Sequence, residues 1–169
     1  GWPLWGFAAS LLVAVSGFLA ARTGYHAPAD LGMDVHLPVA YWILQVLLLG
    51  DPRWTQTLFE NPILLAAWLG LFVQGLNLIP VGQLDGGHVL YAFAKGRHRW
   101  ASTGVAIAML AYAAFQPQWL IWAALLFFVL GLRHPPTFRD QEPLTPRQIA
   151  LGVWATLIFF LCFLPARFA

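Results

Sequence analysis

A polar stretch from Asn77 to His88 interrupts a region, Pro62 to Phe93, that is otherwise apolar. The stretch holds an asparagine, a proline, three glycines, a glutamine, an aspartate and a histidine, whereas a helix that faces lipid carries few such residues. Proline removes a backbone donor, and two adjacent glycines loosen a helix. A break of this kind persists at membrane depth only where it is buried in protein or lines a cavity. The stretch therefore predicts a polar site built at a break in a membrane helix.

The balance of apolar and charged residues excludes a soluble domain of useful size. Hydrophobic residues make up 60% of the 169 positions and charged residues 9%, whereas a soluble domain carries about 25% charged residues. We predict an all-α fold, a multi-pass transmembrane helical bundle, in which residues 1–169 form a single transmembrane domain. The sequence starts at Gly1 and its methionines are Met33 and Met109, so we expect it to be the C-terminal part of a longer membrane protein.

The apolar segments predict about five spans. They cover residues 3–21, residues 62–76 with 85–94 as the two halves of one broken span, and residues 100–115, 118–132 and 149–165. Residues 37–50 are too few for the roughly 20 residues that an ordinary span needs, so we expect a re-entrant or interfacial segment there. Cys162 is the only cysteine, which excludes an internal disulfide and a multi-cysteine metal site.

Basic residues gather in two short loops, residues 95–99 and 133–147, which the positive-inside rule assigns to the cytoplasm. Two predicted spans separate these loops, so both fall on one side and residues 22–36 on the other. We interpret the net charge of +2 as a topology signal, and we expect the lipid bilayer rather than nucleic acid as a partner. About ten helical residues, or roughly 15 Å, separate Asp85 from the first loop. Its carboxylate is therefore expected near the middle of a hydrocarbon core about 30 Å thick.

The polar stretch contains a recognisable motif. Asn77-x-x-Pro80-x-x-x-Leu84-Asp85-Gly86 resembles the NxxPxxxLDG motif of the site-2 protease family (peptidase M50) of intramembrane zinc metalloproteases, and all five specified positions match. The resemblance implies that Asp85 is the third zinc ligand. It also implies that the other two ligands are the histidines of an HExxH helix, whose glutamate is the general base.

That HExxH helix does not occur in these 169 residues. The histidines are His26, His36, His88, His98 and His134, and none of them is followed by glutamate. We therefore expect the chain as given to be catalytically incomplete, with no catalytic residue of its own and with the general base upstream. Joined to such a helix, it would be a metalloendopeptidase of the site-2 type.

Asp85 admits two interpretations. Aspartate is a good N-cap, and its charge suits the positive end of a helix, so Asp85 could simply cap the second half of the broken helix. An ionised carboxylate is also a suitable zinc ligand beside two imidazoles. We favour the ligand because the whole motif matches, and both roles can hold together. His88 lies one turn later, and we expect it to hydrogen-bond a neighbour near the metal rather than to bind zinc itself.

Asn77 also has two possible roles. Its amide could satisfy backbone groups that Pro80 leaves without partners, or it could hold a substrate backbone, since it offers both a donor and an acceptor. We assign Asn77 and Pro80 to a substrate-binding segment on the strength of the resemblance. The four histidines outside the polar stretch are expected in loops, exposed to solvent: His26, His36, His98 and His134.

The resemblance implies zinc-dependent intramembrane proteolysis, with Zn²⁺ as cofactor and membrane-tethered regulatory proteins as substrates. Such transmembrane substrates must unwind before cleavage, because a helical backbone hides its carbonyl groups. The alternative is a non-catalytic family member, or a transporter fragment that uses Asp85 as a proton or cation site, since broken helices also occur in transporters.

Overall fold

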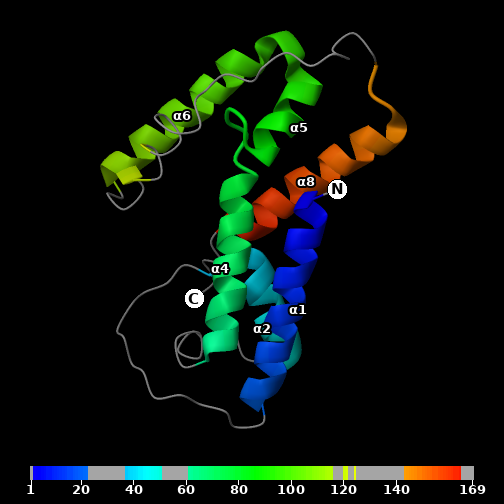
Figure 1. Cartoon of the computed structure of the whole chain (residues 1–169). Coiled ribbons are helices and arrows are strands. Elements are labelled where there is room, and N and C mark those ends of the chain that lie inside the picture. Colours follow the sequence, from blue (N-terminus) through cyan, green and yellow to red (C-terminus); the bar gives the residue numbers. More distant parts are fainter. Residues whose placement is uncertain are drawn as a thin grey trace. The chain divides into compact units, whose positions relative to one another are not determined.

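The computed structural model describes residues 2–22, 37–50, 61–115, 120–121, 124 and 143–164, and this part of the chain is helical with no strand. The prediction of an all-α fold is confirmed for it. The helices are α1 (Trp2–Arg22), α2 (Val39–Leu49), α4 (Pro62–Asn77), α5 (Asp85–Ala94), α6 (His98–Phe115) and α8 (Pro146–Phe163), with a 3₁₀ helix η2 (Lys95–Arg97) before α6 (Figure 1). Most of the predicted segment 118–132 lies outside the described residues.

The chain divides into two compact units. The first comprises Gly1–Leu76 and Leu157–Ala169, and the second comprises Asn77–Thr156. The polar stretch and its motif belong to the second unit.

In the first unit, α1 and α4 approach closely where their side chains are small. A Cβ atom on Gly17 would lie 2.7 Å from Cδ2 of Leu64, and one on Gly70 would meet the hydroxyl of Ser10. Glycine and serine let two helix backbones pack more closely than larger residues would, which is the usual way helices associate in lipid. Small residues of α1 therefore serve its packing against α4.

Asn61 fixes the start of α4 and also links it to α1. Its Oδ1 accepts hydrogen bonds from the backbone N–H groups of Ile63 at 2.9 Å and Leu64 at 3.4 Å, which are donors that a helix start leaves without partners. Its Nδ2 donates to the carbonyl oxygen of Gly17 at 3.3 Å. The side chain is fully buried, so a single asparagine caps one helix and joins it to another.

Helix α2 adds to the core of the first unit, to which the end of α8 also contributes the buried side chains of Ile158 and Cys162. The rings of Phe18 and Tyr41 pack with centroids 5.0 Å apart, and both side chains are almost entirely buried. The helix has 11 residues, which corresponds to roughly 16 Å and about half of a hydrocarbon core. Gly50 ends it in the left-handed conformation at φ 73°, with its N–H donated to the carbonyl of Val46.

In the second unit, η2 turns the chain from α5 into α6 (Figure 1). The part of α8 that belongs to this unit, up to Thr156, packs on α5, where the ring of Phe93 lies against Gly152. Helix α8 begins at Pro146, earlier than the predicted residue 149, so the end of the predicted loop 133–147 is already helical. The reason is a capping box. The N–H of Thr145 donates to Oε1 of Gln148 at 2.8 Å, and the N–H of Gln148 donates to the Thr145 hydroxyl at 3.4 Å.

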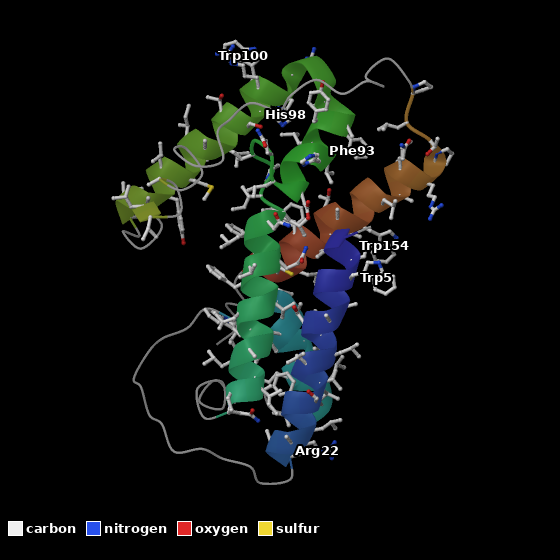
Figure 2. All side chains as sticks on the ribbon, in the orientation of Figure 1. Trp5, Arg22, Phe93, His98, Trp100 and Trp154 are labelled. Carbon is white, nitrogen blue, oxygen red and sulfur yellow. The ribbon has the colours of Figure 1, made fainter. Side chains whose placement is uncertain are left out.

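Two helices in the described part are long and apolar enough to cross a membrane, Leu4–Arg22 and Pro146–Phe163. Only 22% of each is buried inside the structure, and large apolar side chains such as Trp5 and Trp154 stay exposed (Figure 2). The helices Val39–Leu49 and Pro62–Asn77 are apolar but shorter.

Candidate functional site

The site is built on a loop, residues 78–84, that separates α4 from α5. Proline at position 80 has no N–H and disfavours helical geometry in the residue before it, which accounts for the end of α4 at Asn77. The loop folds back on itself through two hydrogen bonds between residues close in sequence, from Val81 N–H to the Ile79 carbonyl at 2.8 Å and from Leu84 N–H to the Val81 carbonyl at 3.3 Å. Gly82 has a φ of 57°, in the region that favours glycine.

The loop backbone crosses the first turn of α5 at two glycines. A Cβ atom on Gly86 would overlap the carbonyl oxygen of Leu78, and a Cβ atom on Gly87 would overlap that of Gly82. No other residue type has the space to fit at these two positions unless the backbone moves. The glycine pair was expected to loosen a helix, but the structure shows that it makes room for the loop.

Three apolar side chains anchor the loop: Leu78, Ile79 and Val81 are at most 3% exposed. Gln83, by contrast, is exposed. An irregular loop with a buried backbone needs partners for its carbonyl groups, and the loop satisfies several of them internally or against α5. The loop is therefore a packed element of the second unit.

Asp85 begins α5, and its carboxylate is paired with Asn77. The amide Nδ2 of Asn77 donates to Oδ2 of Asp85 at 2.7 Å, and both side chains are partly buried. The two motif residues are eight positions apart, and the folded loop brings them into contact. The helix start supplies positive partial charge to the carboxylate, and the hydrogen bond fixes its orientation.

His88 lies one turn along α5 and is exposed. Its Nδ1 is 2.9 Å from the carbonyl oxygen of Leu84, and its backbone N–H donates to the same oxygen at 3.0 Å. A carbonyl only accepts, so Nδ1 carries the hydrogen in this contact. The imidazole thus holds the residue that precedes Asp85.

The Pro80 carbonyl is bound by a residue that the sequence interpretation did not select. Ser102 of α6 is fully buried, and its hydroxyl donates to the Pro80 oxygen at 3.4 Å. The same hydroxyl lies 3.3 Å from Nε2 of His98, whose ring packs edge-on against Tyr91 with centroids 5.4 Å apart. A hint was present in the sequence, because His98 and Ser102 are four residues apart and so share a face of a helix.

The prediction that His98 lies exposed in a loop is wrong. His98 is the first residue of α6 (Figure 2). Its side chain is 3% exposed. Its neighbours Arg97 and Arg99 are exposed, as expected for the basic cluster, but His98 faces inward because it contacts Ser102 and Tyr91. The predicted loop 95–99 is the 3₁₀ helix η2 followed by the start of α6. The other histidines assigned to loops, His26, His36 and His134, lie outside the described residues.

Within the described ranges, no group of three histidine, cysteine, aspartate or glutamate side chains could hold a metal ion. A carboxylate such as that of Asp85 is an ordinary zinc ligand, but zinc sites in proteins use three or four protein ligands. The described residues therefore fit part of a zinc site and not a complete one.

A protein-family comparison decides the identity of the motif. The model of peptidase family M50 matches residues 6–116 of the chain, a range that contains the whole motif from Asn77 to Gly86 and also Ser102. The chain belongs to peptidase family M50. The resemblance to the site-2 proteases is thereby confirmed. No solved structure matches this M50 chain.

The curated proteins described next, to which the chain is similar, come from plants. The chain is 31% identical, over 99% of its length and 30% of the relative's, to "Probable zinc metalloprotease EGY2, chloroplastic" of Arabidopsis thaliana. It is 31% identical to the protein of the same name from Oryza sativa subsp. indica, over 98% of its length and 31% of the relative's. A third relative, "Probable zinc metalloprotease EGY3, chloroplastic" of the same rice, is 31% identical over 62% of the chain and 18% of the relative. The chain thus spans about a third of the EGY2 proteins.

Proposed function

We propose that this M50 chain is the part of a zinc-dependent intramembrane metalloprotease that supplies the third zinc ligand, Asp85. The observation that carries the proposal is the 2.7 Å hydrogen bond from Asn77 to Asp85 inside the family motif. A carboxylate held by an amide at a helix start has a fixed orientation, as a metal ligand needs. The names of the plant relatives, which describe zinc metalloproteases, support the choice of metal.

The proposed arrangement in the membrane has about five spans in one transmembrane domain, residues 1–169. Residues 62–76 and 85–94 form the two halves of one span broken at the motif, and residues 37–50 form a re-entrant or interfacial segment. Residues 95–99 and 133–147 face the cytoplasm. The two described helices of spanning length and the 11-residue α2 support this arrangement.

When bound, zinc would lower the pKa of a coordinated water so that it can attack a peptide bond. The carboxylate of Asp85 would hold the metal, and the N–H of Asn77 would keep that carboxylate in place. The general base is expected from an HExxH sequence, which these 169 residues do not contain. Activity would therefore require that this chain be joined to such a helix.

Asn77 would serve both the metal ligand and the substrate. A primary amide has two N–H donors and one carbonyl acceptor, and the contact with Asp85 uses one donor. An unwound substrate backbone presents both N–H and C=O groups, so the remaining capacity of the amide matches it. Pro80, in the same loop, would place the substrate next to this amide. The substrates proposed are membrane-tethered regulatory proteins.

Asp85→Asn in the full-length protein tests the proposal. Asparagine keeps the size of the side chain and caps a helix nearly as well as aspartate, but it removes the charge. We expect cleavage of a membrane-tethered substrate to fall by at least roughly 100-fold, more than the usual loss for residues that only orient a ligand. The zinc content should fall too, while helix content and insertion stay unchanged. Near-normal cleavage and zinc occupancy would remove Asp85 from the ligand set.

A further inference from the structure

We propose that Ser102 and His98 are positioning residues of the candidate site, which hold the motif loop through the carbonyl of Pro80. This inference rests on the proposed function for its effect on catalysis. Its effect on the loop itself follows from the contacts alone.

The hydrogen bonds that join His98, Ser102 and Pro80 have a defined direction. A serine hydroxyl has one hydrogen, and the Ser102 hydrogen goes to the Pro80 oxygen. With that hydrogen used, the 3.3 Å contact between Ser102 Oγ and His98 Nε2 is a hydrogen bond when the imidazole nitrogen donates. The chain of donors therefore runs from His98 through Ser102 to Pro80. All three belong to the second unit.

Without the hydrogen bond from Ser102, the loop would lose a contact that ties it to α6. His88 of α5 binds the last loop residue, Leu84, whereas the middle of the loop meets α5 by close backbone packing, with the carbonyls of Leu78 and Gly82 against Gly86 and Gly87. Packing of this kind limits how near the loop can come but does not stop it from moving away. The Ser102 hydroxyl binds the loop from α6 and opposes that movement. Because Asp85 directly follows the loop, a displaced loop would also shift the carboxylate and its contact with Asn77.

The side chains of Ser102 and His98 are both buried. Ser102 is 0% exposed and His98 is 3% exposed, so neither side chain can replace its partner with bulk water. When one partner of a buried hydrogen bond is removed, the other group is left without a partner. The free-energy cost of that group is larger than the net contribution of the hydrogen bond itself. Removing either side chain should therefore disturb the loop, although neither residue belongs to the motif.

The test uses hydrogen exchange in the full-length protein, in lipid nanodiscs, read on peptides covering residues 78–88. We expect Ser102→Ala to raise exchange of these amides on the order of fivefold, as for the loss of one net hydrogen bond. Thr103→Ala is the matched control, because it removes a hydroxyl from the next position of α6, and it should leave exchange unchanged. Equal exchange in Ser102→Ala and the unaltered protein, or an equal rise in Thr103→Ala, would overturn the proposal.

His98 is tested by a pair of variants. Glutamine can place an N–H near the position of Nε2, whereas phenylalanine keeps the ring volume without the donor. We expect His98→Gln to exchange like the unaltered protein and His98→Phe like Ser102→Ala. The double variant His98→Phe with Ser102→Ala should exchange no faster than Ser102→Ala alone, because the two residues act through one contact. Identical behaviour of the glutamine and phenylalanine variants would show that His98 serves packing only.

Cleavage gives the second readout and separates the two proposals. With a membrane-tethered substrate, Ser102→Ala should lower kcat about tenfold while KM changes less than about twofold, since a misplaced ligand impairs the chemical step. If the unaltered full-length protein cleaves nothing, the proposed function fails, and the exchange data still decide the role of Ser102. If kcat falls without faster exchange of the loop, the positioning role is wrong.

Discussion

At the scale of single residues, the contact between Asn77 and Asp85 is the feature of the site most open to test. Asn77→Ala removes the N–H that orients the carboxylate. We expect the affinity of the full-length protein for zinc to fall by roughly 10-fold, the lower end of the range for groups that orient a metal ligand. Competition with a chelator measures this affinity. Gln83→Ala is the control, because it removes an exposed amide from the same loop, and an equal loss there would contradict the assignment.

Gly86 allows a second test at this scale. An added methyl group would overlap the Leu78 carbonyl oxygen, so Gly86→Ala forces the backbone to move. We expect a loss of about 1–3 kcal/mol of stability, as for overpacked positions, and a lower midpoint in thermal unfolding. Gly104→Ala should raise the midpoint, because nothing lies within 4 Å of that position and alanine favours a helix interior by about 0.5–1 kcal/mol. Equal effects of the two substitutions would show that the loop does not need the space.

The sequence was sufficient to select the residues of the motif but not their surroundings. Asn77 and Asp85 could be chosen because polar groups stand out in an apolar region, and the structure pairs them. Ser102 was not chosen, because one serine in an apolar helix is common, and its four-residue spacing from His98 does not reveal the contact with the Pro80 carbonyl. His98 was misjudged for a related reason. It stands among three basic residues, so its sequence neighbours suggested that the side chain is exposed to solvent. In the structure, the side chain instead contacts Ser102 and Tyr91.

At the scale of helices, most boundaries followed from proline, asparagine and glycine. Helix α5 covers Asp85–Ala94, the range predicted for it, and α4 ends one residue beyond the prediction. The predicted start of α8 at residue 149 is three residues late, because the predicted loop extends to residue 147 and so includes Thr145, Pro146 and Arg147. Threonine followed three residues later by glutamine is a capping box, and proline suits the first helical position. The basic residue within it suggested a loop, but hydrogen bonds at the cap decide the boundary.

The two caps make different predictions about stability. Thr145→Ala should cost about 1 kcal/mol, the usual value for a helix cap, because the site is exposed. Asn61→Ala should cost more, since Asn61 is fully buried and also holds the Gly17 carbonyl of α1. Unfolding midpoints of the two variants in the same detergent provide the comparison. A smaller loss for Asn61→Ala would contradict its role between α1 and α4.

At the scale of the whole molecule, topology is the quantity to measure. Single cysteines at Arg99 and Thr145, in a chain with Cys162 replaced, should resist an impermeant thiol reagent in intact cells. A cysteine among residues 22–36 should react. The positive-inside rule gives this orientation. Labelling of the Arg99 position from outside would overturn it.

The zinc content of the isolated 169-residue chain is a further quantity to measure. The isolated chain should bind zinc weakly, because one carboxylate cannot fill a site that ordinarily has three protein ligands. Elemental analysis after purification and dialysis tests this expectation. Tightly held zinc in a one-to-one ratio would mean that residues outside the described ranges complete the site.

The crossing of the loop over Gly86 and Gly87 changes how the motif should be searched for in other sequences. The glycine after the aspartate is required by space and not by metal chemistry, and the second glycine meets the Gly82 carbonyl in the same way. A search pattern that ends in aspartate and two glycines is therefore a geometric criterion as well as a chemical one. A chain that keeps the aspartate but carries a larger residue at either following position would need a different loop path, even if it still bound the metal.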